Sequence, residues 1–283
     1  MTVPLAGRAV PVLFAAVVAA GAVVLGAMLL APVLARALVD WSPGAQEALF
    51  SLLLYGLLAL VAVVGRKLAR LTGGGSASAG RWIALGVAIG VGGLMLTLGY
   101  ATLAGAVARG AGVAGAGMLL FGSVVMVGQA ASEELFFRGW IQPVLARAWH
   151  PALAILVTAL AFAALHVAGG ARTPLTLVNL LLGGILFGLL AWRSGGLAAS
   201  IAAHAGWNWS EGIVFGLDPN PGAGSFGAVH DLDLIGASLW GGSGEGLNAS
   251  IAMTIVLVAF IVPVAAAALP ARRITPAAPA VSG

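Results

Sequence analysis

The stretch GAGVAGAGMLLFGSVVMVGQAASEELFFR, residues 110–138, decides how this chain folds. Its first 23 residues, Gly110 to Ser132, carry no charged side chain. About 20 apolar residues in a helix cross the hydrocarbon core of a bilayer, whereas an open sheet could not satisfy its backbone there. The stretch therefore predicts a transmembrane helix, and it raises the question of why that helix ends in Glu133, Glu134 and Arg138.

The rest of the chain has the same character. Of its 283 residues, 61% are hydrophobic and only 8% are charged, far from the composition of a soluble domain. We predict an all-α polytopic membrane protein with about eight transmembrane helices. The uncharged or nearly uncharged runs are Ala9 to Ala35, Ala48 to Gly65, Trp82 to Ala108, Gly110 to Ser132, Ala148 to Ala171, Thr173 to Trp192, Ser194 to Ser210 and Gly246 to Ala271.

Composition also excludes several classes of function. Cysteine is absent, which rules out disulfides, thiolate metal sites and a cysteine nucleophile. The net charge is +4, but the basic residues are scattered between apolar runs and form no stripe for a nucleic acid. Membrane lipid is the expected partner. The richness in alanine and glycine is typical of high-GC bacteria, so we expect an integral protein of a bacterial cytoplasmic membrane; the sequence carries no signal for the oligomeric state.

The basic residues predict the topology. One arrangement leaves only Arg36, Arg109 and Arg172 on one side of the membrane. The positive-inside rule then places both termini in the cytoplasm. Seven acidic residues, Glu211 among them, fall outside in this arrangement. The basic residues on the cytoplasmic side are Arg8, Arg66, Lys67, Arg70, Arg81, Arg147, Arg193, Arg272 and Arg273.

The domain organisation follows from a change in composition. A Gly/Ser-rich segment at 73–81 predicts a flexible cytoplasmic linker. It separates two N-terminal transmembrane helices in 1–72 from a six-helix catalytic core in 82–273, whose motifs lie in 133–208. Residues 274–283 are expected to form a disordered tail.

The charges in the opening stretch are functional candidates, because ionisable groups inside a membrane are costly unless they are paired or wetted. Glu134 and Arg138 stand at i and i+4, with the acid first, which is the better orientation for a helical ion pair. Glu133 points about 100° away from Glu134 on the same helix. It therefore needs another partner.

Two histidines and an asparagine are candidate partners for Glu133, and the first of them is His166. His150 and Pro151 read as a turn between two helices, with Glu134 lying 16 residues before His150 and His166 lying 16 residues after it. At about 1.5 Å per residue, antiparallel helices bring the carboxylates and this imidazole to the same level.

Further along the chain, His204 and Asn208 lie one turn apart on one helix face. Such a set suits hydrolysis: a carboxylate activates water, an imidazole shares or donates a proton, and N–H groups hold an oxyanion.

These residues resemble the CAAX protease and bacteriocin-processing (CPBP, Abi) family of intramembrane glutamate endopeptidases, which includes the enzyme that trims prenylated CAAX proteins. The resemblance covers about Gly110 to Glu211, and the three motifs together are specific. They read Glu133-Glu134-x-x-x-Arg138, Phe162-x-x-x-His166 and His204-x-x-x-Asn208.

The resemblance implies a catalytic role for four residues. Glu133 and His166 would activate water, and His204 and Asn208 would steady the tetrahedral intermediate. It also implies an eight-helix architecture, no required cofactor, and a substrate that is a membrane-associated or lipid-modified peptide or protein. The supporting residues that would shape the site are Glu134, Arg138 and Phe162.

Three alternatives remain at this point. Glu133, His166 and His204 are also residue types that hold zinc. The same polar groups could serve a proton- or ion-coupled transporter, although no inverted repeat is visible. Thirdly, they could fix helix packing in a non-catalytic membrane scaffold or immunity protein.

Overall fold

The computed structural model describes residues 6–71, 78–110, 112, 115–220 and 226–267. The predicted tail 274–283 and most of the predicted linker 73–81 lie outside the described residues. In chain order, the elements are α1 (Ala6–Ala37), α2 (Pro43–Leu68), α3 (Ala79–Leu103), β1 (Val107–Arg109), α4 (Ala116–Phe136), the π-helix η1 (Phe137–Ile141), α5 (Gln142–Ala148), α6 (Pro151–Ala168), α7 (Pro174–Ser194), α8 (Ala198–Trp209), the π-helix η2 (Ser210–Val214), β2 (Leu232–Leu234), the 3-10 helices η3 (Ser238–Trp240) and η4 (Gly246–Ala249), and α9 (Ile251–Ala266).

Every apolar run of the sequence contains a helix, which confirms the all-α polytopic membrane fold. Within the described residues, six helical segments are long and apolar enough to cross a bilayer: α1, α2, α3, the continuous α4–α5 segment, α6 and α7. The apolar helix α9, with 16 residues, and α8, with 12, are shorter. A total of eight crossings therefore stays a prediction.

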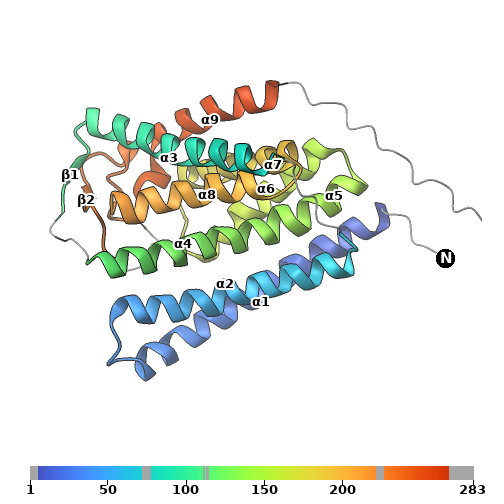
Figure 1. Ribbon diagram of the computed structural model, residues 1–283, viewed down its shortest axis with the longest axis horizontal. Helices are drawn as coiled ribbons and strands as arrows, with labels where there is room; N and C mark the ends of the chain where they lie inside the picture. The colour runs from blue at the N-terminus through green and yellow to red at the C-terminus, as the bar shows by residue number, and fades with distance from the viewer. Residues whose placement is uncertain (1–5, 72–77, 111, 113–114, 221–225, 268–283) are drawn as a thin grey trace, which may run out of the picture.

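The two ends of the molecule differ in structure. At one end, on the left of Figure 1, β1 pairs antiparallel with β2, Ala108 opposite Asp233. The helix is thus shorter than the third charge-free run, Trp82 to Ala108, because α3 stops at Leu103 and the chain continues into β1. At the opposite end of the molecule, α1 begins and α9 ends (Figure 1). That arrangement agrees with termini on one side, although which side faces the cytoplasm stays a prediction.

The outer surface is apolar where lipid would lie. Phe14, Leu52, Leu103 and Leu120 are between 69% and 87% exposed, on α1, α2, α3 and α4 respectively. Apolar side chains in such number on a helical surface require a nonpolar solvent. Lipid supplies it.

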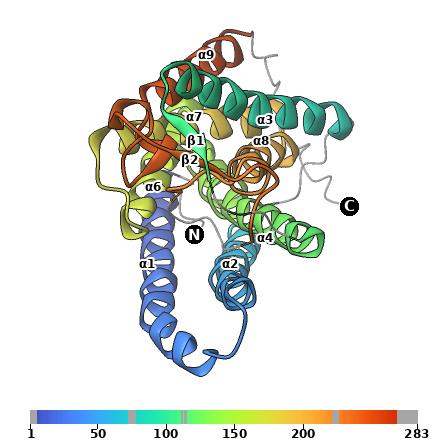
Figure 2. The same cartoon turned by 90° about the vertical axis from the view of Figure 1, so that its left-hand side faces the viewer.

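Helix α8 lies among α3, α4 and α7 (Figure 2). It approaches α3 closely because glycines line the contact: a Cβ on Gly86 would stand 2.4 Å from the carbonyl oxygen of Ala199, and one on Gly90 would stand 2.2 Å from that of Ala203. Small residues four apart permit such an approach in a membrane. The contact fixes the height of α8 in the bundle.

The N-terminal pair α1 and α2 packs on the outside of this bundle (Figures 1 and 2). Gly65 of α2 accommodates the indole of Trp140, which would come within 2.1 Å of a Cβ there. The neighbouring Arg66 guanidinium donates a hydrogen bond to the carbonyl of Gly139. Both contacts involve η1, so the pair is anchored at the π-helix.

Two π-helices interrupt the bundle: η1 contains Arg138 of the first motif, and η2 follows the third motif. Segment η1 begins three residues after Glu134, and η2 begins two residues after Asn208. A π-turn changes the phase of a helix and is frequent at functional sites. No periodicity in the sequence predicted either one.

Candidate active site

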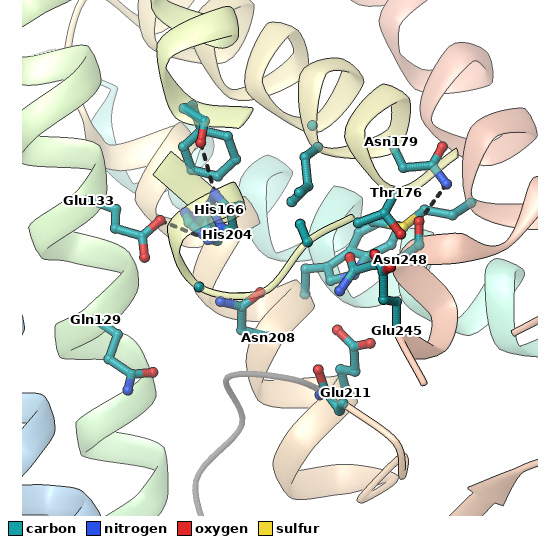
Figure 3. A pocket seen from close by; sticks show the side chains of 18 of the residues that line it. Gln129, Glu133, His166, Thr176, Asn179, His204, Asn208, Glu211, Glu245 and Asn248 are labelled. Atoms are coloured by element: carbon teal, nitrogen blue, oxygen red, sulfur yellow. Dashed lines mark hydrogen bonds and ion pairs between the residues drawn. The ribbon is translucent and has the colours of Figure 1, made fainter. Parts of the chain in front are cut away.

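The four candidate catalytic residues line one pocket of about 230 Å³. Glu133 comes from α4, His166 from α6, and His204 and Asn208 from α8 (Figure 3). This arrangement agrees with the prediction that antiparallel helices bring Glu133 and His166 to the same level. The turn that brings α6 alongside is also as predicted, since His150 caps the N-terminus of α6 and Pro151 occupies its first turn.

The predicted ion pair between Glu134 and Arg138 is present and fully enclosed. Arg138 Nη1 lies 2.9 Å from Glu134 Oε1, and neither side chain is exposed. Arg138 Nη2 donates to the carbonyl of Gly184 on α7 at 2.8 Å. Its guanidinium also lies 4.7 Å from the ring centre of Phe162. A buried charge needs such compensation, so Arg138 joins α4, α6 and α7 into one frame.

Glu134 has a second partner that the sequence did not predict. His204 Nδ1 lies 3.0 Å from Glu134 Oε1. A carboxylate oxygen can only accept, so Nδ1 carries the hydrogen and Nε2 of His204 is left for the pocket. The pair thus orients the His204 ring. Phe187 stacks on that ring at 4.7 Å between centroids and an angle of 15°.

Glu133 points away from this frame, as predicted from its helical phase. Its Oε2 lies 4.0 Å from Nε2 of His204, too far for a direct hydrogen bond. The residue is 9% exposed, and Oε2 has no hydrogen-bond partner among the described residues. Oε2 therefore keeps an unused capacity to accept a hydrogen bond.

His166 is held by its own helix. Its Nδ1 lies 2.8 Å from the carbonyl oxygen of Phe162, which fixes the hydrogen on Nδ1 and leaves Nε2 as an acceptor. The Phe162 ring lies 4.5 Å from the His166 ring and 5.9 Å from that of His204, centre to centre. Phe162 therefore separates and supports both imidazoles, in agreement with its predicted supporting position.

Asn208 completes the set one turn beyond His204. It lines the pocket, and its amide forms no hydrogen bond to another described residue. The amide N–H groups are therefore free to donate to a bound carbonyl.

The structure adds lining residues that the motifs do not contain. Tyr55 comes from α2, and Gln129 lies one turn before Glu133 on α4. Gln129 Nε2 donates to Ser51 Oγ of α2 at 2.9 Å. The i−4 spacing from Glu133 could have identified Gln129, whereas nothing in the sequence pointed to Tyr55.

Glu211 was predicted only as one of the acidic residues on the outer side of the membrane. It is 5% exposed and lines the pocket on η2. Its position three residues after Asn208 continues the same helix face. That spacing was readable, but the residue sits at the end of an apolar run and was taken for a topology signal.

The far end of the pocket is lined by the segment before α9. Glu245 accepts hydrogen bonds from the backbone N–H groups of Arg172 at 3.2 Å and of Thr173 at 3.0 Å, just before α7. Burial alone would raise the pKa of Glu245, but hydrogen bonds from Thr176, Arg172 and Thr173 outweigh it and hold the pKa below its ordinary value. Asn248 lies next to it on η4 and also lines the pocket.

The described residues contain no group of three His, Cys, Asp or Glu side chains placed to hold a metal ion. The alternative zinc set of Glu133, His166 and His204 thus has no support from the geometry.

Comparison with known proteins agrees with the resemblance. The family model described as type II CAAX prenyl endopeptidase Rce1-like matches residues 115–210, a region that contains all three motifs. A search of curated proteins and a search of solved structures found no match. The match confirms the resemblance to the CPBP (Abi) family over these residues.

The match and the apolar helices indicate an integral membrane protein. The family whose model matches residues 115–210 is one of CAAX prenyl endopeptidases, that is, of peptide hydrolases.

Proposed function

We propose that this chain is an intramembrane endopeptidase in which Glu133 activates a water molecule for attack on a peptide bond. The observation that carries the proposal is the gathering of Glu133, His166, His204 and Asn208 around one pocket. Three helices contribute these side chains, and helix packing alone would not require them to converge.

Glu133 is the base because it lines the pocket and its carboxylate forms no hydrogen bond to another described residue. Glu134 cannot take this part, since it is fully buried, does not line the pocket and shares its Oε1 with Arg138 and His204. A water molecule bound to Glu133 loses a proton to the carboxylate as its oxygen attacks the carbonyl carbon. The protonated carboxyl then gives the proton to the departing amine as the C–N bond breaks.

The two histidines assist from different positions. Nε2 of His166 is an acceptor when the ring is neutral, so it shares the proton of the attacking water. The bond from Nδ1 of His204 to Glu134 turns Nε2 of that ring toward the pocket. In its imidazolium form, His204 donates Nε2–H to the oxyanion together with the amide of Asn208. Glu134 and Arg138 act on the reaction only by holding His204.

The substrate is a membrane-associated or lipid-modified peptide or protein in a bacterial cytoplasmic membrane. The pocket continues from Glu133 to Glu245 and Asn248, beside Leu247, which packs in one core cluster with Leu234 of β2. Water and an extended peptide would enter from that end. No metal ion or organic cofactor takes part in this scheme.

The test is a comparison of new protein termini in membranes of cells that express the chain or its Glu133→Gln variant at equal levels. The proposal predicts amino termini that appear with the wild type and disappear with Glu133→Gln. A non-catalytic scaffold or immunity protein would give the same termini and the same biological effect in both. A transporter would instead show proton-coupled uptake in proteoliposomes that Glu133→Gln abolishes.

A further inference from the structure

Glu211 is an acidic residue of the pocket that the proposed reaction does not use. It lies on η2, seven residues after His204 and three after Asn208, and faces the same pocket (Figure 3). Seven residues correspond to about 10 Å along a helix. Glu211 is therefore close enough to contact a substrate held at His204, but not its scissile bond.

This carboxylate is buried without compensation. Its side chain is 5% exposed and forms no hydrogen bond or ion pair with another described residue. Residues 221–225, which the structure does not describe, read Pro-Gly-Ala-Gly-Ser and carry no charge. Buried carboxylates are normally paired, because desolvation of an isolated charge is unfavourable. A partner from outside the chain would supply what the described residues do not.

The rest of the pocket favours a cation as that partner. Three carboxylates line it, from Glu133, Glu211 and Glu245, and the described lining residues include no lysine or arginine. Glu245 already accepts from the backbone of Arg172 and Thr173, and Glu133 faces His204. Of these three lining carboxylates, Glu211 alone has no counterpart in the described part of the chain.

We propose that Glu211 binds a cationic group of the peptide substrate, a lysine or arginine side chain or a free amino terminus. This inference rests on the proposed protease function and names a class of substrate for it. An extended peptide advances about 3.3 Å per residue, so the cationic residue lies about three residues from the scissile bond. A positive charge at this position of the substrate distinguishes the substrate from the uncharged peptide segments that surround the protein in the membrane.

A metal ion fits the same position less well. Glu211 belongs to no group of three His, Cys, Asp or Glu side chains that could coordinate one within the described residues. An ammonium or guanidinium group needs only one carboxylate and neighbouring acceptors such as the amide oxygen of Asn208.

The test uses N-palmitoylated synthetic peptides with an uncharged Ala/Leu/Ser body, in which one lysine or one glutamine is moved through every position. The purified full-length chain in lipid nanodiscs is expected to cleave the lysine peptide about tenfold or more faster than its glutamine counterpart at one position near the cleaved bond. In Glu211→Gln this ratio should fall to about one. Glu211→Asp keeps the charge and should retain a preference for lysine, and Glu245→Gln, which changes a carboxylate that is already satisfied, should leave the ratio unchanged.

The outcomes separate this inference from the proposed function. A ratio that is unaltered in Glu211→Gln overturns the inference, as does an equal loss of the ratio in Glu245→Gln. If Glu211→Gln slows all peptides alike, Glu211 is structural and the inference is wrong. Binding is measured separately in Glu133→Gln by displacement of a fluorescent lysine peptide: tighter binding of lysine than glutamine peptides supports the recognition site even if no peptide is ever cleaved, a result that would refute only the protease.

Discussion

The pocket has an inner end, beside Glu134 and His204, and an outer end, at Glu211 and Glu245, and the two ends compensate their charges differently. At the inner end, Arg138, Glu134 and His204 form a closed set in which each charge is bonded. At the outer end, Glu245 is bonded to backbone N–H groups, whereas Glu211 faces the cavity without a hydrogen bond or ion pair to another described residue. The matched residues 115–210 include the whole inner end and stop one residue short of Glu211. The inner end therefore holds a fixed geometry, whereas the outer end leaves a carboxylate for the proposed cationic group of the substrate.

The largest loss of stability is expected at the inner end. Arg138→Met leaves Glu134 buried without its cation, which should lower the free energy of unfolding by about 3–5 kcal/mol. Thermal unfolding in detergent measures it. Addition of Glu134→Gln to Arg138→Met should restore part of the loss, because the uncompensated charge is then gone. Equal stability of wild type and Arg138→Met would show that the inner end is not held by this pair.

The next effect concerns the α3–α8 contact that sets the height of His204. Gly90→Ala would place a Cβ 2.2 Å from the carbonyl oxygen of Ala203, so the helices must separate. Overpacking of this kind costs about 1–3 kcal/mol. Gly92→Ala is the matched control on the same helix, since nothing lies within 4 Å of its Cβ. We expect unchanged stability there, and similar losses in both variants would contradict the described contact.

A smaller effect is expected at the outer end, where Glu245 satisfies the N–H groups before α7. Glu245→Gln should cost about 1 kcal/mol, as for loss of a helix cap. Because the folded state lowers the pKa of Glu245, this contribution is present above its ordinary value of 4.5 and is lost as the pH falls through the folded value. The difference in unfolding temperature between wild type and Glu245→Gln should therefore shrink on acidification. A gap that widens at low pH would contradict the assigned hydrogen bonds.

An effect of similar size is expected where α2 forms a wall of the pocket. Ser51→Ala removes the acceptor of Gln129 and should cost about 1 kcal/mol in unfolding free energy. Gln129 reaches the pocket one turn from Glu133, so a modest change in turnover is expected as well. Ser132→Ala serves as the control, because that hydroxyl bonds only to the carbonyl of Gly128 in its own helix. A larger loss of unfolding free energy in Ser132→Ala than in Ser51→Ala would contradict the role assigned to the hydrogen bond from Gln129 to Ser51.

Much of the inner end could be predicted from the sequence, because the relevant rules are local. The i, i+4 spacing gave the Glu134–Arg138 pair, and the equal distances of Glu134 and His166 from the His150 turn placed them at one level. Charge-free runs gave the helices. The glycines at helical spacing also indicated close packing, and Gly86 and Gly90 are found at the α3–α8 contact.

The rest depends on tertiary geometry that no local rule contains. The bond from His204 to Glu134 joins residues 70 positions apart, and Tyr55 reaches the pocket from a helix outside the motifs. The π-helices η1 and η2 alter helix phase without a sequence signal. The place of Glu211 in the pocket was missed because an acidic residue at the end of an apolar run usually marks the membrane surface, whereas here the helix continues and buries the residue.

The measurement that tests the central claim most directly is the rate at which purified protein cleaves a peptide found by the comparison of membrane termini. Wild type and Glu133→Gln are assayed in the same nanodiscs, with unfolding temperature as the check on folding. Loss of a general base should lower turnover by about a hundredfold to ten-thousandfold while the unfolding temperature stays close to that of the wild type. Cleavage by Glu133→Gln at the wild-type rate would contradict the role of Glu133 as the base that activates water.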